Sequence, residues 1–399
     1  MRPRYRFDRM ELAGSLGDLG TLLPMAIGMI LINGLDPMGM FIAIGIFYIL
    51  AGLYYGITVP VQPMKVIGAY AIATAMTPSQ IMASAALMGL FLLVIGGTNA
   101  ITLIGRYTPK AVVRGVQLST GTLLMAQGVK FMLGSSKFQL MRQAAEPYLV
   151  VQHFGPVPAG ILIGIIGGIL TLFLLENKKF PAGLVIVLGG ITLGLVLGTH
   201  EGFASLKPGI YFPKLLPFGF PAQADFTFAL FALVLPQLPM TIGNAVVANA
   251  DLSREYFGDD SKKVTYRALT ISMALANLLS FLLGGMPLCH GAGGLAAHYR
   301  FGARTTGSNL MIGGLFVALA LFLGYHALAI VYLVPMSILG VLLVFAGSQL
   351  ALTIIDIKTR KELFVILMML GITLATNLAV GFVVGIAVAY ALTSDRLNV

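Results

Sequence analysis

The sequence predicts an all-α membrane protein that crosses the bilayer many times. Hydrophobic residues make up 58% of the 399 residues and charged residues only 10%, against about 25% charged residues in soluble domains. Glycine is frequent, with 48 residues, as in closely packed transmembrane helices. A span needs about 20 apolar residues, and about fourteen apolar segments fill the chain. We therefore expect residues 1–399 to form one transmembrane unit without a soluble domain.

The composition excludes several classes of protein. A mean hydropathy of +0.92 excludes a soluble enzyme, a disordered scaffold and a nucleic-acid-binding domain. The net charge of +10 does not indicate a nucleic-acid partner, because the basic residues lie mostly between apolar segments. The single cysteine, Cys289, excludes an intramolecular disulfide and a cysteine metal cluster. We expect no cofactor and no metal.

The apolar segments predict the spans in chain order. They are residues 10–32, 38–56, 63–77, 80–104, 109–134, 157–175, 181–198, 225–249, 265–284, 289–299, 307–324, 335–354, 361–376 and 378–394. The third and the tenth are too short to cross a ~30 Å hydrocarbon core as helices. Each follows a proline-containing stretch, at 59–63 and 286–288, so we expect short strands followed by half-helices.

The basic residues predict the orientation in the membrane. Of the 25 Lys and Arg residues, nineteen fall on the side of the N-terminus when the chain is threaded through fourteen spans. Lys65 stays within the membrane, and five fall on the opposite side: Lys130, Lys137, Arg142, Lys207 and Lys214. Because basic loops remain in the cytoplasm, both termini are expected to be cytoplasmic, in the cell (inner) membrane.

Two parts of the chain, 10–77 and 225–299, follow one plan. Each has a helix with a polar stripe, then a mostly apolar helix, then a broken strand with a short helix. The stripes share the spacing i, i+4, i+7, on one helix face: Glu11, Ser15 and Asp18, and Gln237, Thr241 and Asn244. Seven spans per repeat would invert the halves, and paired interrupted segments are typical of a transporter's midplane site.

The first half-helix begins with a charge. Pro63 is a favoured helix start, and a helix N-terminus carries about +0.5 charge with free N–H donors, which bind anions. Lys65 adds a full positive charge in the first turn, and a cation there opposes the helix dipole. It therefore needs a counter-charge, which is a bound anion or Asp18, unless the side chain extends to the membrane interface.

The second half-helix begins in the glycine-rich stretch 286–294. Glycines let a ligand approach the backbone closely. The run 291–296 also fits a dinucleotide-binding pattern, which we reject because no soluble βαβ unit surrounds it. His290 either donates to an oxyanion or titrates, or it is a buried histidine bonded to a backbone carbonyl. Cys289 either lines the site or is a small packing residue.

The charges favour a dianion as the ligand. Two helix dipoles supply about +1 and Lys65 supplies +1, which would repel a cation and exceed what a nucleobase needs. Asp18, a carboxylate within a span, either couples transport to an ion or forms a structural ion pair with Lys65. Gln237 and Asn244 offer amides to the site or hold helices together. The predicted substrate-binding residues are Gln62, Pro63, Lys65, Gln237, Asn244, Cys289, His290, Gly291 and Gly293.

Sequence signals of an enzyme are absent. The chain contains no GxSxG, HExxH or GxxxxGK[ST] motif, and its five histidines are scattered. We therefore expect a protein that is not an enzyme and that does not hydrolyse ATP.

Four stretches carry a family resemblance. They are residues 14–21 (GSLGDLGT), 60–65 (PVQPMK), 235–246 (LPQLPMTIGNAV) and 285–304 (GMPLCHGAGGLAAHYRFGAR). With these stretches, which fall in both halves, the sequence resembles the molybdate transporter family, a branch of the sulfate permease (SulP) superfamily. Sulfate permeases usually carry a C-terminal soluble STAS domain. This chain stops at Val399, soon after the last span, as the molybdate branch does.

The resemblance implies an architecture. It implies seven plus seven inverted spans, divided into a core and a gate domain. Residues 1–134 and 225–354 hold mainly the core segments 1–4 and 8–11, with gate segments 5 and 12. Residues 157–198 and 361–394 hold gate segments 6, 7, 13 and 14. It also implies a substrate site between the half-helices, elevator-like alternating access and a homodimer formed through the gate domain.

Together these patterns predict secondary active uptake of molybdate, a tetrahedral oxyanion, coupled to protons through Asp18. Coupling to Na⁺ and uncoupled exchange stay open. The alternatives are the same machine moving sulfate or oxyanions in general, a passive anion channel, and a nucleobase permease of the same fold.

Overall fold

Long apolar helices dominate the computed structural model, which describes residues 5–98, 100, 109–175, 177, 180–199 and 206–393. Within these residues, six helical stretches are long and apolar enough to span a membrane: Pro37–Tyr55 (α3), Pro78–Thr98 (α5), Gln223–Ser261, Tyr266–Leu283 (α14), Thr306–Val331 and Met336–Asp356. α1 (Arg9–Leu16) and α2 (Leu19–Leu31) form a seventh if the bent pair is one span. The chain is therefore a helical multi-pass membrane protein, as expected.

The structure contains further helices and strands besides these spans. In order they are β1 (Gln62–Pro63), α4 (Lys65–Thr74), α7 (Lys110–Leu133), α8 (Lys137–Arg142), β2 (His153–Phe154), β3 (Val157–Pro158), α9 (Ala159–Leu174), α10 (Ala182–Leu197), α11 (Gln223–Ala229), η2 (Leu230–Val234), α12 (Leu235–Met240), η3 (Thr241–Ala248), α13 (Asn249–Phe257), η4 (Gly258–Ser261), β4 (Leu288–Cys289), α15 (Ala292–Phe301), α16 (Thr306–Leu323), η5 (Gly324–Ala327), α17 (Leu328–Val331), α18 (Met336–Ala351), η6 (Leu352–Asp356), α19 (Arg360–Ala375) and α20 (Leu378–Ala391). Each of the fourteen predicted segments contains a helix. Six counted basic residues lie outside the described residues: Arg2, Arg4, Arg106, Lys178, Lys179 and Arg396.

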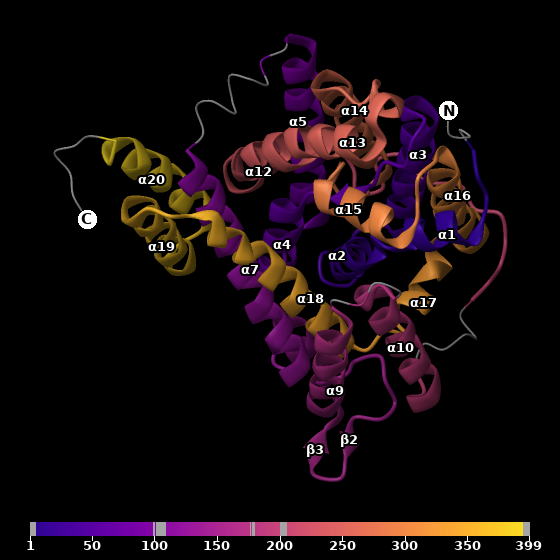
Figure 1. Ribbon diagram of the computed structural model, residues 1–399. Coiled ribbons are helices and arrows are strands. Elements are labelled where there is room, and N and C mark those ends of the chain that lie inside the picture. The colour runs from indigo at the N-terminus through magenta and orange to yellow at the C-terminus, as the bar shows by residue number, and fades with distance from the viewer. Residues whose placement is uncertain are drawn as a thin grey trace.

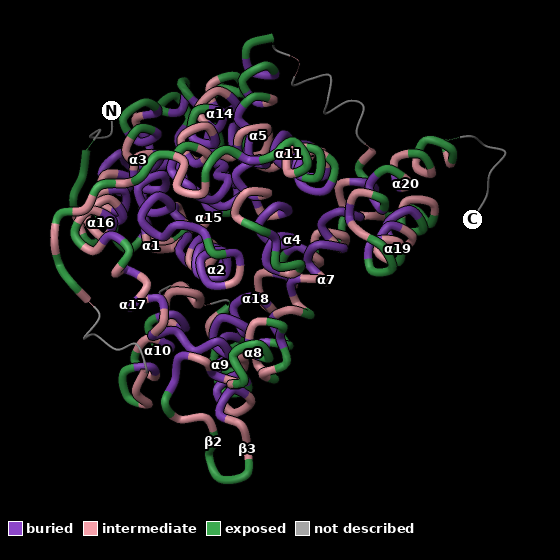
Figure 2. The backbone as a smooth tube through the Cα atoms, turned by 180° about the vertical axis from the view of Figure 1, so that it is seen from behind, coloured by how far each residue is buried: buried purple, intermediate pink, exposed green. Residues whose placement is uncertain are grey.

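The helices form two groups (Figure 1). α7, α9, α10 and α18–α20 gather in one group, and α1–α5 with α11–α16 gather in the other. The most extensive pairings are α7 with α18, α3 with α16, and α5 with α14. Figure 2 shows buried chain concentrated where α2, α4 and α15 meet, with exposed chain at the periphery. Peripheral apolar side chains such as Phe173 are exposed, as expected for surfaces that face lipid.

The first predicted span is broken rather than continuous. α1 ends at Leu16, α2 begins at Leu19, and the two are bent by 47°. Gly17 is a poor helix former, and Asp18 takes the N-cap position of α2. The three residues of the expected polar stripe, Glu11, Ser15 and Asp18, therefore have different hydrogen-bond partners. Glu11 accepts hydrogen bonds from the backbone N–H groups of Arg304 and Thr305, and Ser15 donates to a carbonyl of its own helix.

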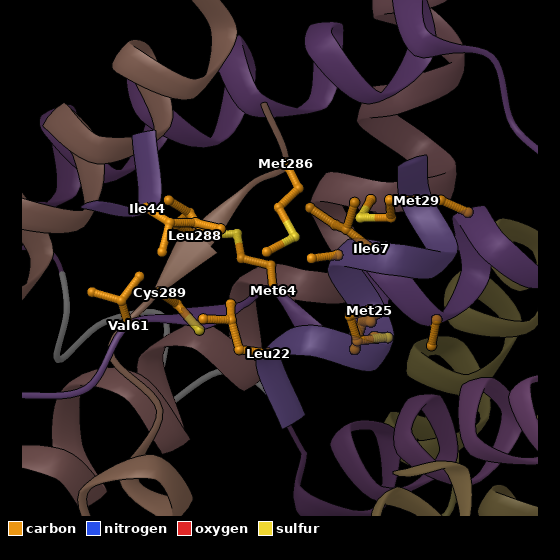
Figure 3. Close-up of a cluster of buried hydrophobic side chains, with 14 of the residues drawn as sticks. Leu22, Met25, Met29, Ile44, Val61, Met64, Ile67, Met286, Leu288 and Cys289 are labelled. Carbon is orange, nitrogen blue, oxygen red and sulfur yellow. The ribbon is translucent and has the colours of Figure 1, made fainter. Parts of the chain in front are cut away.

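β1 and β4 cross at the centre of the second group. They pair antiparallel, with Gln62 opposite Cys289 and Pro63 opposite Leu288. Each strand leads directly into a ten-residue helix, α4 or α15, so the two predicted interruptions are confirmed. Figure 3 shows side chains around the strands, Val61, Met64, Leu288 and Cys289 among them, in one buried apolar cluster.

Two asparagines hold the extended chain in place. Asn277 of α14 donates to the carbonyl of Leu288 at 2.8 Å and accepts from its N–H at 3.1 Å. Asn309 of α16 does the same for Val59, at 2.7 and 3.0 Å. Each carboxamide replaces a neighbouring strand, so buried polar backbone next to the site is satisfied.

Candidate substrate-binding site

The candidate site lies where the N-termini of α4 and α15 meet. A Cβ added at Gly293 would lie 3.8 Å from Lys65 Nζ. Apart from its own helix backbone and its chain neighbours, no other atom of the described residues would lie within 4 Å of it. A Cβ added at Gly291 would overlap Gln62 Oε1 and lie 3.4 Å from Asn244 Nδ2. The fold therefore brings five predicted site residues together from three separate segments of the chain.

A cavity of about 410 Å³ opens beside this meeting point. Residues from both helix groups line it, with Lys65 and Asn244 on one side and Gln117 of α7 and Gln349 of α18 on the other. A second cavity of about 260 Å³ has several of the same lining residues and also reaches Gly293. Since one water occupies about 30 Å³ in the liquid, there is room for a small oxyanion with waters.

The Lys65 ammonium is the charged group of the cavity wall. Among the residues that the structure describes, no salt bridge reaches it. The structure therefore does not contain the direct ion pair between Lys65 and Asp18 that was the alternative. A half-buried cation beside two helix N-termini leaves a positive potential that an anion would neutralise.

Asp18 lies behind the site rather than in its wall. The carboxyl group is buried, and Oδ1 accepts a hydrogen bond of 2.5 Å from Gln62 Nε2. In the described part of the chain Oδ2 has no hydrogen-bond partner. A Cβ added at Gly294, at the start of α15, would lie only 2.5 Å from Oδ2. Gln62 thus links Asp18 to the glycines of the site.

Gln237 supports a half-helix rather than facing the cavity. Its Oε1 accepts from the N–H groups of Val66 and Ile67 at 2.9 and 3.3 Å, and its Nε2 donates to Thr241. The side chain therefore caps α4. It takes up two first-turn N–H groups that the sequence analysis expected to be free for an anion.

Asn244 reaches the cavity from the π-helix η3. Pro239 lies between the π-helical stretches η2 and η3 and lacks an N–H, so the α-helical ladder is interrupted there. π-helical turns of this kind are frequent at functional sites.

His290 and Cys289 stabilise the crossing of the strands. His290 Nδ1 donates to the carbonyl of Pro60 at 2.8 Å, because a carbonyl only accepts, and Nε2 lies 2.9 Å from Ser272 Oγ. This matches the expectation of a buried histidine bonded to a backbone carbonyl. Cys289 Sγ contacts the carbonyl of Pro63 at 3.5 Å and is buried. Neither side chain is part of the cavity wall.

Four polar residues near the site come from segments that the sequence patterns did not single out. Gln117 and Thr353 enter the cavity wall from α7 and η6, and Asn277 and Asn309 hold the strands. Each is a polar residue in a mostly apolar stretch, which is a weak signal because polar neighbours such as Ser119 and Ser308 carry it as well.

Comparison with known proteins identifies the family of the chain. Residues 10–124 and 229–350 match the model of a family described as "Molybdate transporter of MFS superfamily". Molybdate transporter 1 of Arabidopsis thaliana is 30% identical over 411 residues, covering 96% of this chain and 87% of the relative. The chain belongs to the molybdate transporter family.

Other members of the molybdate transporter family are similar over the same extent. Molybdate transporter 2 of Arabidopsis thaliana is 30% identical, covering 94% of this chain and 85% of its own. Molybdate transporter 1 of Chlamydomonas reinhardtii is 28% identical, covering 94% and 90%. Because these relatives are named transporters, this is a transport protein and not an enzyme.

Solved structures show the fold. The transmembrane domain of the cyanobacterial bicarbonate transporter BicA has a TM-score of 0.62 at 17% identity, covering 96% of this chain and 97% of that one. The murine anion transporter Slc26a9 in the inward-facing state has a TM-score of 0.67 at 14% identity, covering 98% and 70%. The fold is therefore that of the SLC26/SulP transporters, although the family description refers to the MFS superfamily.

Proposed function

We propose that the chain takes up molybdate by secondary active transport, with the oxyanion bound between the N-termini of α4 and α15. The observation that carries the proposal is the Lys65 ammonium, which lines the cavity beside both helix ends without a salt bridge in the described part of the chain. Membership of the molybdate transporter family supports molybdate as the anion.

The N-termini of α4 and α15 differ in how many N–H donors they can offer to an anion. Gln237 occupies two N–H groups of α4, and the Met64 N–H bonds to the carbonyl of Pro287, which leaves Lys65 as the donor there. At α15 the N–H of Gly294 turns back to Gly291, so the preceding N–H groups at 291–293 are the helix end that faces an anion. The dianion would thus rest mainly on α15 and on the Lys65 side chain.

The helix pairings support seven plus seven inverted spans. In such a repeat the second segment corresponds to the ninth and the fourth to the eleventh. The α3–α16 pair then exchanges with the α14–α5 pair, while α7–α18 and β1–β4 each map onto themselves. These four pairings are all present. The core domain would be α1–α5 with α11–α16, and the gate domain α7, α9, α10 and α18–α20.

Alternating access would move the core domain against the gate domain. The cavity is lined by both groups of helices, so a shift between them would close it on one side. We further propose that both termini are cytoplasmic in the cell membrane, on the charge bias of the loops, and that two copies associate through the gate domain.

Asp18 is the proposed site of proton coupling. Its hydrogen bond to Gln62 connects a buried carboxyl group to the glycines that would hold the anion. A proton on Asp18 would remove a negative charge behind the site and offset the repulsion of an incoming dianion. Sodium coupling would leave uptake independent of a proton gradient.

The deciding experiment is uptake of labelled molybdate into proteoliposomes that contain the purified protein, with and without an inward proton gradient. Saturable uptake that excess sulfate barely inhibits is expected. The Lys65→Ala variant should lose molybdate binding and keep the thermal stability of the wild type, since no salt bridge among the described residues involves the ammonium. Unchanged affinity of this variant would remove Lys65 from the site.

The same assay separates the alternatives. Strong competition by sulfate would widen the function to a general oxyanion carrier. Flux far above carrier turnover would indicate a channel. If folded protein moved neither anion, the nucleobase permease and the anion channel would become the leading interpretations.

A further inference from the structure

Gln117 lies in the cavity wall opposite Lys65. It lies on α7, in the group of helices opposite the half-helices, and it lines the same 410 Å³ cavity as Lys65 and Asn244. The side chain is held tightly, since the residue is only 4% exposed.

Arg114 fixes the orientation of the Gln117 carboxamide. Its Nη1 donates to Gln117 Oε1 at 2.8 Å. Thr353 Oγ1 lies 2.9 Å from the same oxygen and 2.7 Å from the carbonyl of Leu350, so its one proton is shared between these two acceptors. A guanidinium group only donates, so the atom that faces Arg114 is the oxygen. The amide nitrogen Nε2, with its two N–H donors, is therefore on the other branch of the side chain.

An ionic network keeps this orientation rigid. Arg114 binds Asp356 through Nε at 2.9 Å and Nη2 at 2.6 Å, and Lys110 reaches the same carboxylate at 2.9 Å. The planar two-point contact leaves the guanidinium little freedom. Arg114 therefore cannot turn away from Gln117 without breaking its ion pair with Asp356.

The Gln117 amide nitrogen remains available to a ligand. Within the described residues no hydrogen bond uses Nε2, and it is not among the buried polar atoms sealed off from partners. We propose that Gln117 is a gate-side ligand of the transported oxyanion. Its Nε2 donates to an oxygen of the anion that faces away from Lys65. This inference rests on the proposed function, and it adds a contact from the helices across the cavity.

The contact has a consequence for the transport cycle. Gln117 belongs to the group of helices opposite the half-helices. The contact therefore exists only while the two groups of helices lie on either side of the anion. When the helices carrying Lys65 shift against α7, the anion leaves Gln117 behind. Gln117 then raises the affinity of this one orientation without contributing to the other.

The Gln117→Glu variant tests the inference. A carboxylate keeps an acceptor for Arg114 and Thr353, so a purely structural role would be preserved. The same change replaces the amide N–H donors with a negative oxygen that repels the oxyanion. We expect the KM for molybdate in proteoliposomes to rise about tenfold or more. Gln80→Glu, which adds the same charge outside the cavity, should keep the KM of the wild type.

Two further variants keep the inference falsifiable. Gln117→Leu removes the donor without adding charge and should also raise the KM. Thr353→Val keeps the side-chain shape, removes one of the donors that orient the carboxamide, and should raise the KM several-fold. Thermal unfolding in detergent identifies any variant that does not fold. If folded Gln117→Glu and Gln117→Leu proteins transport with the KM of the wild type, the inference is wrong. If the wild type itself shows no saturable molybdate uptake, the proposed function fails instead.

Discussion

At the start of α15, three glycines in four residues have different neighbours. Gly291 lies against Gln62 Oε1 and Gly294 against Asp18 Oδ2, so a side chain at either position would collide with a buried polar group. Gly293 instead is exposed and faces Lys65 across open space. Two glycines thus permit the packing of the site, and the third leaves the space that an anion would occupy.

Gly293→Ala should therefore separate binding from folding. The added methyl group would lie 3.8 Å from Lys65 Nζ, an ordinary contact distance, so thermal stability should stay close to that of the wild type. The methyl group would occupy space next to the ammonium, so molybdate affinity should fall at least tenfold. Gly291→Ala, which overlaps Gln62, should lower stability as well. Wild-type affinity in Gly293→Ala would place the anion elsewhere.

Asp18→Asn tests the coupling role at the same scale. The asparagine Oδ1 still accepts from Gln62 Nε2, so the local geometry is preserved while the titrating group is removed. We expect molybdate uptake to lose its dependence on pH. Asp259→Asn, which removes an exposed carboxylate paired with Lys262, serves as the control. A pH profile like that of the wild type in Asp18→Asn would exclude the coupling role.

At the scale of single elements, buried polar side chains cap the helix ends that lie inside the protein. Gln237 caps α4 and Glu11 binds the backbone just before α16. Glu146, in the loop between α8 and β2 and outside the spans, accepts from the N–H groups of Met336 and Ser337 at 2.7 and 2.9 Å. These contacts satisfy N–H groups that have no partner within their own helix.

Glu146 should make stability depend on pH. Burial raises the pKa of its carboxyl group to about 7, although the hydrogen bonds from the start of α18 act in the opposite direction. The folded protein therefore retains a proton that the unfolded chain loses near pH 4.5. The stabilisation is fully present below about pH 4.5 and is lost as pH rises through about 7.

Thermal unfolding of the wild type and of Glu146→Gln checks this prediction. Glutamine keeps an acceptor for the two N–H groups but does not titrate. Between pH 5 and 8 the Tm of the wild type should fall relative to that of Glu146→Gln. Parallel curves would mean that Glu146 keeps one protonation state across this range. Glu146→Ala should be less stable at every pH by about 1–3 kcal/mol, because it leaves two buried N–H groups unpaired.

At the scale of the whole molecule, the two groups of helices touch backbone to backbone beside the cavity. Gly20 of α2 and Gly183 of α10 both line the cavity, and a Cβ added at Gly183 would overlap Gly20 Cα. Small residues at such contacts let transmembrane helices approach closely. Movement of one group against the other must therefore pass through this contact.

Gly183→Ala is expected to force the groups apart. Overpacking of this kind costs about 1–3 kcal/mol, so the Tm should fall and the rate of molybdate uptake should change. Gly189→Ala is the control on the same helix, because no atom of a neighbouring described segment lies within 4 Å of the added Cβ. It should stay within about 0.5 kcal/mol of the wild type. Equal behaviour of the two variants would show that the contact does not constrain the arrangement.

The sequence by itself determined the class of fold and singled out Lys65 as a candidate residue. Hydropathy and glycine content predicted the helices, and the proline-broken stretches predicted the two strands with their half-helices. Lys65 stood out because a charge within an apolar segment is rare. These are properties of local composition and spacing, which require no knowledge of distant partners. The motifs also predicted the molybdate transporter family, which the comparisons confirm.

Only the tertiary structure decided which polar groups face the cavity. Gln237 and His290 carried the same kind of signal as Asn244, yet the first two bond to backbone inside the helix group and Asn244 lines the cavity. Gln117 was missed because its orientation depends on Thr353 and Asp356 of η6, more than 200 residues away in the chain. A side chain's orientation is set by which hydrogen-bond partner packing brings within reach, and spacing along one segment does not contain that information.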